Sequence, residues 1–147
     1  MTIDKRICIV RNPTDVIPSF LSLFYTTSHS AVPLKPWNTF NCWDNHTQVF
    51  TDHWVKYHNR IREEAKRVPT YYCTYEQLIL DPIPSMTQMF CFLMGVDSLK
   101  GTILEARILE ICGKGHEGHQ VYTLKAGAGR LFRNIPLYTE VQLSKIS

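Results

Sequence analysis

The sequence predicts an α/β fold in which helices flank a parallel sheet, and three observations support this prediction. Residues 7–11 and 70–75 are short runs rich in β-branched, aromatic and Cys residues, as is typical of strands that are largely buried. A stretch with helical spacing of apolar residues follows each run. A chain of 147 residues is also long enough for one domain with its own core. The alternation of strand and helix therefore favours a layered α/β domain.

The first predicted strand leads directly into a helix start. Asn12 is a capping residue, Pro13 suits the first helical position, and Asp15 is an acid in the first turn. Pro18 complicates this helix because an interior proline removes one backbone hydrogen bond. We therefore expect either a kinked helix or an irregular turn over residues 12–17, with the regular helix beginning near Pro18.

The rest of the chain alternates between helices and loops. Residues 26–45 are rich in Ser, Thr, Pro and Asn and predict a long loop, which is often functional in a compact domain. Helical spacing predicts helices over 46–67, 83–94 and 102–111, with a short helical turn over 76–80. Glycine-rich segments follow at 113–118 and 125–130, and we expect the polar end of the chain to be loosely ordered.

Composition limits the classes of function. The formal net charge of +3 fits a small anionic ligand and is too weak and too scattered for a surface that binds nucleic acid. Five cysteines without paired spacing argue against a disulfide framework, and Cys8 and Cys73 fit better as small core residues. No apolar run is long enough to cross a bilayer, and the first residues do not resemble a signal peptide.

Arg11 and Ser19 are the strongest candidates for a ligand site. Ligands of α/β proteins bind beyond the carboxyl ends of strands, where helix amino termini present free N–H groups to phosphates. Arg11 lies at such a strand end and can bind a phosphate with two hydrogen bonds, and Ser19 can add a hydroxyl. If the helix begins near Pro18, the N–H of Ser19 is also free. The alternative is that Arg11 pairs with Asp15 while Ser19 faces solvent.

The segment ICIVRNPTDVIPSF, residues 7–20, resembles the motif with which sulfotransferases bind the 3′-phosphate of 3′-phosphoadenosine 5′-phosphosulfate (PAPS). In that family an apolar strand leads into Arg-Asn-Pro-x-Asp-Val, with a serine eight positions after the arginine. The resemblance implies that Arg11 and Ser19 hold the 3′-phosphate of PAPS or of its product PAP. It also implies a P-loop-like sulfotransferase fold, here without its first βα unit.

Two further segments resemble the same family. TYYCTYEQLILDP, residues 70–82, resembles the family strand whose final tyrosine approaches the adenine, which implies this role for Tyr75. Its alternative is a core tyrosine that caps the strand. Lys125, Gly127 and Arg130 form a basic, glycine-rich turn similar in chemistry to the late phosphate-binding loop of the family, although a plain basic turn is the alternative. Residues 6–96 of the partial domain carry the resemblance, and residues 97–147 match weakly.

Sulfotransferases bind the 5′-phosphosulfate with a loop that precedes the Arg-Asn-Pro motif, and their catalytic histidine or glutamate lies in the same region. No residue of this chain matches either, so no catalytic residue is assigned. We expect a truncated or partial sulfotransferase domain, whose parent transfers a sulfuryl group from PAPS to a hydroxyl or amine of a small molecule, glycan or protein. The alternatives are a non-catalytic nucleotide-binding or interaction remnant and a kinase-like phosphate binder.

The resemblance also raises expectations about acceptor, partners and compartment. The loop over residues 26–45 is the candidate for shaping the acceptor side. A sheet without its first strand leaves edges uncovered, which favours a partner chain or a homo-oligomer. The chain as it stands fits the cytoplasm, whereas a full-length parent fits either the cytoplasm or the Golgi membrane.

Other candidate sites are weaker. Cys112, His116 and His119 lack a fourth zinc ligand, so no metal site is expected. His53 and His58 fit a helix surface. Residues 113–118 lack the spacing of a Walker loop. The three tryptophans fit either core packing or an acceptor pocket, and they are Trp37, Trp43 and Trp54.

Overall fold

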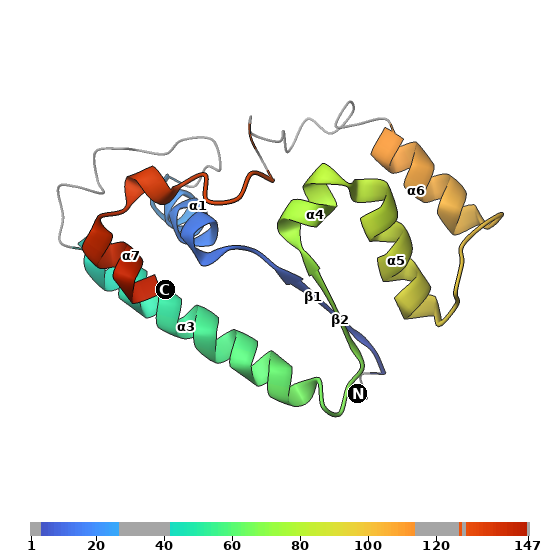
Figure 1. Cartoon of the computed structure of the whole chain (residues 1–147), viewed down its shortest axis with the longest axis horizontal. Helices are drawn as coiled ribbons and strands as arrows, with labels where there is room; N and C mark the ends of the chain where they lie inside the picture. The colour runs from blue at the N-terminus through green and yellow to red at the C-terminus, as the bar shows by residue number, and fades with distance from the viewer. Residues whose placement is uncertain (1–3, 27–41, 114–126, 128, 147) are drawn as a thin grey trace. The chain divides into compact units, whose positions relative to one another are not determined.

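The computed structural model describes residues 4–26, 42–113, 127 and 129–146 (Figure 1). Two compact units make up the chain, and their segments alternate along the sequence. The first, here called the sheet unit, comprises residues 1–10 and 65–130. The second, here called the helical unit, comprises residues 11–64 and 131–147.

The sheet unit contains the two predicted strands as a parallel pair. β1 (Arg6–Val10) and β2 (Thr70–Thr74) run in register, with Arg6 opposite Thr70 and Val10 opposite Thr74. The predicted parallel sheet is therefore confirmed. Each strand ends one residue earlier than predicted, so Arg11 and Tyr75 are the residues that follow the strands.

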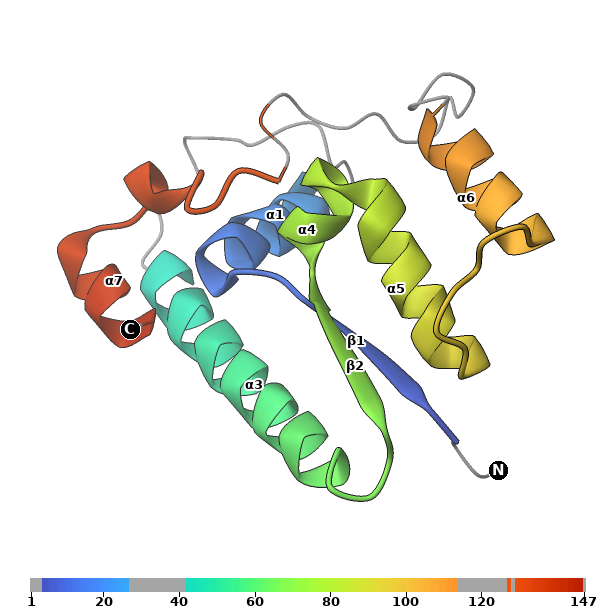
Figure 2. The same cartoon turned by 45° about the vertical axis from the view of Figure 1, so that its right-hand side comes forward.

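In the described residues of the sheet unit, three helices follow the strands. They are α4 (Tyr75–Leu80), α5 (Pro82–Met94) and α6 (Ile103–Gly113), and both figures show α5 beside α6 (Figure 2). The Tyr71 ring packs on that of Phe92 of α5, with centroids 5.6 Å apart, and its hydroxyl donates to Gln88 Oε1 at 3.1 Å. Lys5 Nζ donates to the carbonyl of Phe92 at 2.7 Å, where the negative end of the helix dipole favours a cation.

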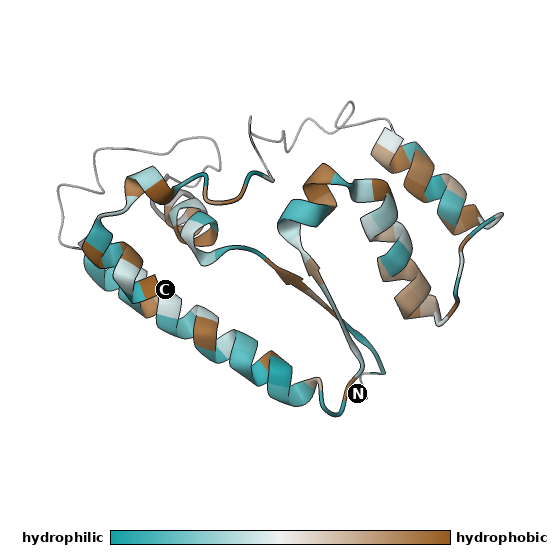
Figure 3. Cartoon of the chain, in the orientation of Figure 1, coloured by the Kyte–Doolittle hydropathy of each residue, from teal (hydrophilic) through white to brown (hydrophobic). Residues whose placement is uncertain are grey.

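The helical unit packs α1 (Pro13–Thr26) and α7 (Glu140–Ile146) against the long α3 (Cys42–Glu64), with a 3-10 helix, η1 (Ile135–Leu137), before α7. Its core consists of Ile17, Leu21 and Tyr138. The rings of Phe20 and Phe50 join α1 to α3 with centroids 4.6 Å apart. Most of α3 is hydrophilic in Figure 3, as expected of a helix that buries one stripe only.

The structure corrects several predicted boundaries. α1 begins at Pro13 and continues past Pro18, so the alternative of a regular helix beginning near Pro18 is wrong. The predicted loop over residues 26–45 ends early, because α3 begins at Cys42, and residues 27–41 lie outside the described part. α3 also ends at Glu64 rather than at residue 67.

The end of the chain differs most from the prediction. The sequence predicts a loosely ordered end, yet residues 135–146 form η1 and α7. Thr139 and Gln142 explain the start of α7, because the Gln142 N–H donates to Thr139 Oγ1 at 3.3 Å and the Thr139 N–H donates to Gln142 Oε1 at 2.8 Å. This reciprocal pair is a capping box. The amide of Gln142 also donates to Asp44 of α3 and so ties the two helices together.

Three expectations from composition can be compared with the described residues. Cys8 and Cys73 are buried as free thiols, which confirms their assignment to the core. No group of three potential metal-ligating side chains occurs in the part of the chain that the structure describes, and His116 and His119 lie outside it. Of the helices in the described ranges, none combines the length and apolar character that crossing a membrane requires.

Candidate functional site

The start of α1 carries most of the predicted site. Val10 is the last paired residue of β1, and Arg11, which follows it, is half-buried. Asn12 then caps the helix, since its Oδ1 accepts the Thr14 N–H at 2.9 Å and the Thr14 hydroxyl at 2.6 Å. This arrangement explains locally why Asn-Pro follows the arginine: the asparagine satisfies a donor of the first turn and the proline has none to satisfy.

The first turn of α1 offers fewer free donors than the sequence predicted. The N–H of Thr14 is bonded to the Asn12 side chain, and the N–H groups of Asp15 and Val16 both donate to the Asn12 carbonyl at 3.0 Å. Pro13 has no N–H at all. A phosphate at this turn would therefore depend on side chains, chiefly Arg11, rather than on the backbone of the helix end.

Ser19 lies beyond the first turn of α1. It is half-buried and follows Asp15 by four positions, which places both residues on one side of the helix. Its backbone N–H is therefore an interior helical donor, and the prediction of a free Ser19 N–H fails together with the late helix start. The hydroxyl of Ser19 is the group that stays available for the predicted role.

Asp15 has a structural role that the sequence did not predict. The side chain is 2% exposed, and its two carboxylate oxygens accept the backbone N–H groups of Phe132 and Asn134, each at 3.0 Å. The alternative prediction gave Asp15 to Arg11 as an ion-pair partner, whereas the carboxylate is engaged by the backbone of the segment before η1. Asp15 therefore joins the Arg-Asn-Pro-x-Asp segment to the end of the chain.

Pro18 explains a second connection to the same segment. A proline at this position has no N–H for the carbonyl of Thr14, four residues earlier. The hydroxyl of Tyr138 donates to that carbonyl at 3.0 Å. Burial, together with the nearby charge of Asp15, raises the pKa of Tyr138, so the phenol stays protonated and remains a donor.

Tyr75 lies at the start of α4 in the sheet unit. Thr74 is the N-cap, and its Oγ1 accepts the Gln77 N–H at 3.1 Å while Gln77 Oε1 accepts the Thr74 N–H at 3.0 Å. The sequence Thr-Tyr-Glu-Gln is therefore a capping box, a local signal that the sequence prediction did not use. Tyr75 is half-buried as the first helical residue, rather than the last residue of the strand.

The late glycine-rich turn is described in part. Gly127 and Gly129 both have positive φ, at 77° and 84°, and the Arg130 N–H donates to the Gly127 carbonyl at 3.1 Å. A Cβ on Gly129 would lie 2.9 Å from Cγ2 of Ile79, so this position requires glycine for two reasons. Arg130 is exposed. Lys125 lies outside the described residues.

A protein-family model matches a large part of the chain. The family described as "Sulfotransferase domain" matches residues 4–105, which is more than half of the 147 residues. The chain belongs to the sulfotransferase family. The match includes Arg11, Ser19 and Tyr75, and it ends before the glycine-rich turn and the segment that contacts Asp15. Searches among curated proteins and among solved structures gave no match.

Membership of the sulfotransferase family accords with the α/β architecture of the sheet unit and its parallel strands. Sequence reasoning missed the contacts of two residues of the helical unit, Asp15 and Tyr138. Asp15 accepts the N–H of Phe132, and the Tyr138 hydroxyl donates to the Thr14 carbonyl, each across more than a hundred positions in sequence. The acid in the first turn of α1 indicates only a helix start in the sequence. A sequence pattern alone gives no sign that its carboxylate would bind backbone N–H groups near residue 133.

Proposed function

We propose that this sulfotransferase-family chain binds the 3′-phosphate of PAPS, or of its product PAP, through Arg11 and Ser19. The observation that carries the proposal is the spacing of these two residues at a strand-to-helix junction inside the family match. A half-buried arginine is suited to the task because its planar fork can give a phosphate two charge-assisted hydrogen bonds.

The surroundings of Asp15 support the same proposal. A phosphate near the first turns of α1 would be repelled by an adjacent free carboxylate. In this chain two backbone N–H groups bind the carboxylate of Asp15 and offset part of its charge. The segment that begins at Phe132 therefore makes the start of α1 a better place for an anion.

We further propose that the reaction served by this domain is transfer of a sulfuryl group from PAPS to a hydroxyl or amine of a small molecule, glycan or protein. Catalysis of such a transfer depends on positioning and on stabilising charge at the bridging oxygen. Arg11 and Ser19 would hold the donor, and neither is proposed as a general base. The alternative is a non-catalytic remnant that binds the nucleotide. The roles of Tyr75, Lys125, Gly127 and Arg130 stay predictions.

Calorimetry with PAP tests the binding proposal. We expect saturable binding of PAP by the full chain, loss of binding in Arg11→Ala, and a weakening of about ten- to a hundredfold in Ser19→Ala, the effect of one hydrogen bond to a charged group. Arg60→Ala is the matched control because the Arg60 side chain is 79% exposed and pairs with Glu64 in the same helix. Equal affinities of the wild type and Arg11→Ala would remove the proposal.

Two further measurements separate the alternatives. Binding of ATP as tight as that of PAP would favour a kinase-like phosphate binder. Acceptor-dependent release of PAP from PAPS would favour an enzyme, whereas PAP binding without such release would favour the remnant.

A further inference from the structure

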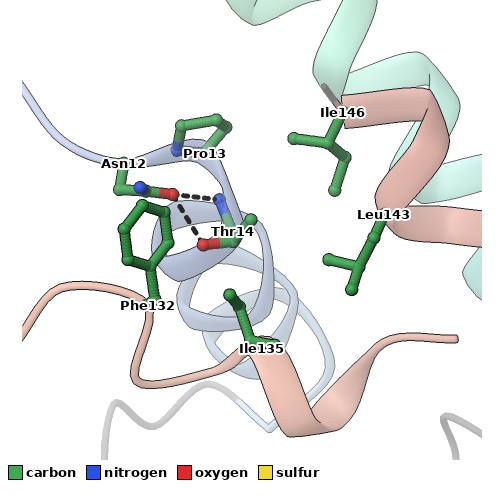
Figure 4. A pocket seen from close by; sticks show the side chains of 7 residues that line it. All are labelled: Asn12, Pro13, Thr14, Phe132, Ile135, Leu143 and Ile146. Carbon is green, nitrogen blue, oxygen red and sulfur yellow. Dashed lines mark hydrogen bonds between the residues drawn. The ribbon is translucent and has the colours of Figure 1, made fainter. Parts of the chain in front are cut away.

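A surface cavity of about 350 Å³ lies on the helical unit beside the start of α1, and it is largely open to solvent (Figure 4). Apolar side chains form most of its wall, contributed by Pro13, Phe132, Ile135, Leu143 and Ile146. Asn12 and Thr14 contribute the polar part. No charged side chain lines it among the described residues, so an ion is a poor occupant.

The volume indicates the size of a ligand. An apolar cavity of about 150 Å³ is enough to hold benzene. The cavity beside α1 is roughly twice as large and falls in the range of small-molecule sites. A compound with two fused rings fits this volume better than a single ring does.

Among the residues of the cavity wall, Phe132 has an unusual backbone conformation. Its φ is +58°, in the left-handed region that bulky residues rarely adopt, and its side chain is 53% exposed. The hydrogen bond from its N–H to Asp15 holds this conformation. Backbone strain of this kind gathers at functional sites, and here it places an aromatic ring in the wall of the cavity.

Asn12 determines which hydrogen-bonding group the cavity offers to a ligand. Its Oδ1 already accepts two hydrogen bonds from Thr14, which fixes the orientation of the amide. The Nδ2 group is left as the donor, and it makes no hydrogen bond within the described part of the chain. Figure 4 shows this amide next to the Phe132 ring, so a ligand stacked on the ring would meet a donor at its edge.

We propose that this cavity is a binding site for a neutral compound with two fused rings, at least one of them aromatic, that carries a hydrogen-bond acceptor such as a carbonyl. The aromatic ring stacks on Phe132 and the acceptor takes a hydrogen bond from Asn12 Nδ2. The proposal does not rest on nucleotide binding, because neither Arg11 nor Ser19 lines the cavity.

Titration of the isotope-labelled full chain with 1-indanone, followed by NMR, tests the proposal. We expect saturable shifts at Asn12, Thr14 and Ile135, with a dissociation constant on the order of 1 mM for a ligand of about ten heavy atoms. Phe132→Ala should weaken binding about three- to tenfold, the effect of one aromatic contact. Leu131→Ala is the matched control, since Leu131 is 55% exposed and does not line the cavity.

A second variant tests the role of the amide. Asn12→Asp keeps an acceptor for Thr14 and removes the donor, so it should bind 1-indanone no better than indane, which has the same rings without the carbonyl. Ile146→Trp fills the cavity and should abolish binding, which keeps the test decisive if Phe132→Ala fails to fold. The proposal would be overturned by shifts that do not saturate, or by equal affinities of the wild type, Phe132→Ala and Ile146→Trp. This result does not depend on whether the chain binds PAP.

Discussion

The hydroxyl of Tyr138 donates to the carbonyl of Thr14 at 3.0 Å, although the two residues are 124 positions apart in sequence. The contact replaces the helical hydrogen bond that Pro18 removes from α1. Together with the two hydrogen bonds to Asp15, it fixes the last segment of the chain to the turn that follows Arg11. The position of the proposed phosphate site therefore depends on residues far along the chain.

Tyr138→Phe should destabilise the helical unit by about 1–3 kcal/mol, because it leaves the Thr14 carbonyl buried without a donor. Unfolding in urea followed by tryptophan fluorescence reports on this unit, since all three tryptophans fall within residues 11–64. Tyr57→Phe, at a side chain that is 57% exposed, should have almost no effect.

The role of Pro18 in this contact can be measured by a double-mutant cycle. In a Pro18→Ala background, the alanine backbone supplies the missing N–H, so Tyr138→Phe should cost less than in the wild type. If the cost of Tyr138→Phe is the same in both backgrounds, the hydroxyl does not replace the helical bond.

Asp15→Asn should destabilise the helical unit by about 2 kcal/mol, because an amide nitrogen would face a backbone N–H in place of a carboxylate oxygen. Hydrogen exchange should show faster exchange at the amides of Phe132 and Asn134 specifically. Asp52→Asn is the control, since Asp52 is exposed and accepts from Gln48 within α3. Unchanged protection of both amides in Asp15→Asn would contradict the assigned contacts.

Gly129→Ala and Gly101→Ala form a matched pair. Both glycines have positive φ, 84° and 76°, so each substitution should cost about 1–2 kcal/mol for the left-handed conformation. Of the two, a Cβ at Gly129 would lie 2.9 Å from Cγ2 of Ile79, whereas a Cβ at Gly101 would have no atom within 4 Å among the described residues. The rate of hydrogen exchange at the amides of α4 should therefore rise more in Gly129→Ala than in Gly101→Ala. Equal exchange rates in the two variants would show that α4 moves to accommodate the added Cβ.

The buried thiols of Cys8 and Cys73 should make stability depend on pH in the alkaline range. Burial, the main cause in both cases, raises the pKa of each thiol above its ordinary value. The unfolded chain ionises first as pH rises above about 8.5, so the free energy of unfolding should decrease from there upward and be unaffected below it.

Alkylation by iodoacetamide at pH 8 gives an independent measurement of the same thiols. Cys8 and Cys73 should react slowly in the folded chain, and the half-buried Cys91 and Cys112 should react faster. Equal rates for all four thiols would contradict the burial of the strand cysteines.

The sequence predicted the parts of the fold that depend on local pattern. The two strands, the capped start of α1, and the helices α4 to α6 agree within one or two residues, because apolar spacing and capping residues act over a few positions. The early start of α3 and the final helix α7 were missed, although the capping box of Thr139 and Gln142 was a readable signal for α7.

The sequence predicted which residues form the candidate site, but not the contacts that they make. Arg11 and Ser19 follow from a motif, whereas the partners of Asp15 and Thr14 lie more than a hundred positions away. Asn12 was predicted as a cap but not as the acceptor for three backbone N–H groups. Because these N–H groups are bonded to Asn12, the helix end has fewer free donors for a phosphate than predicted. Contacts of this kind depend on tertiary packing, which a local pattern does not specify.

The division of the chain into alternating segments has a consequence for its synthesis. The helical unit needs residues 11–64 and residues 131–147, and the whole sequence of residues 65–130 is translated between them. On the ribosome, α1 and α3 therefore emerge long before Tyr138 can reach Thr14, with their apolar sides exposed meanwhile. The sheet unit completes its sequence at residue 130, so we expect it to form first, while the helical unit waits for residues 131–147.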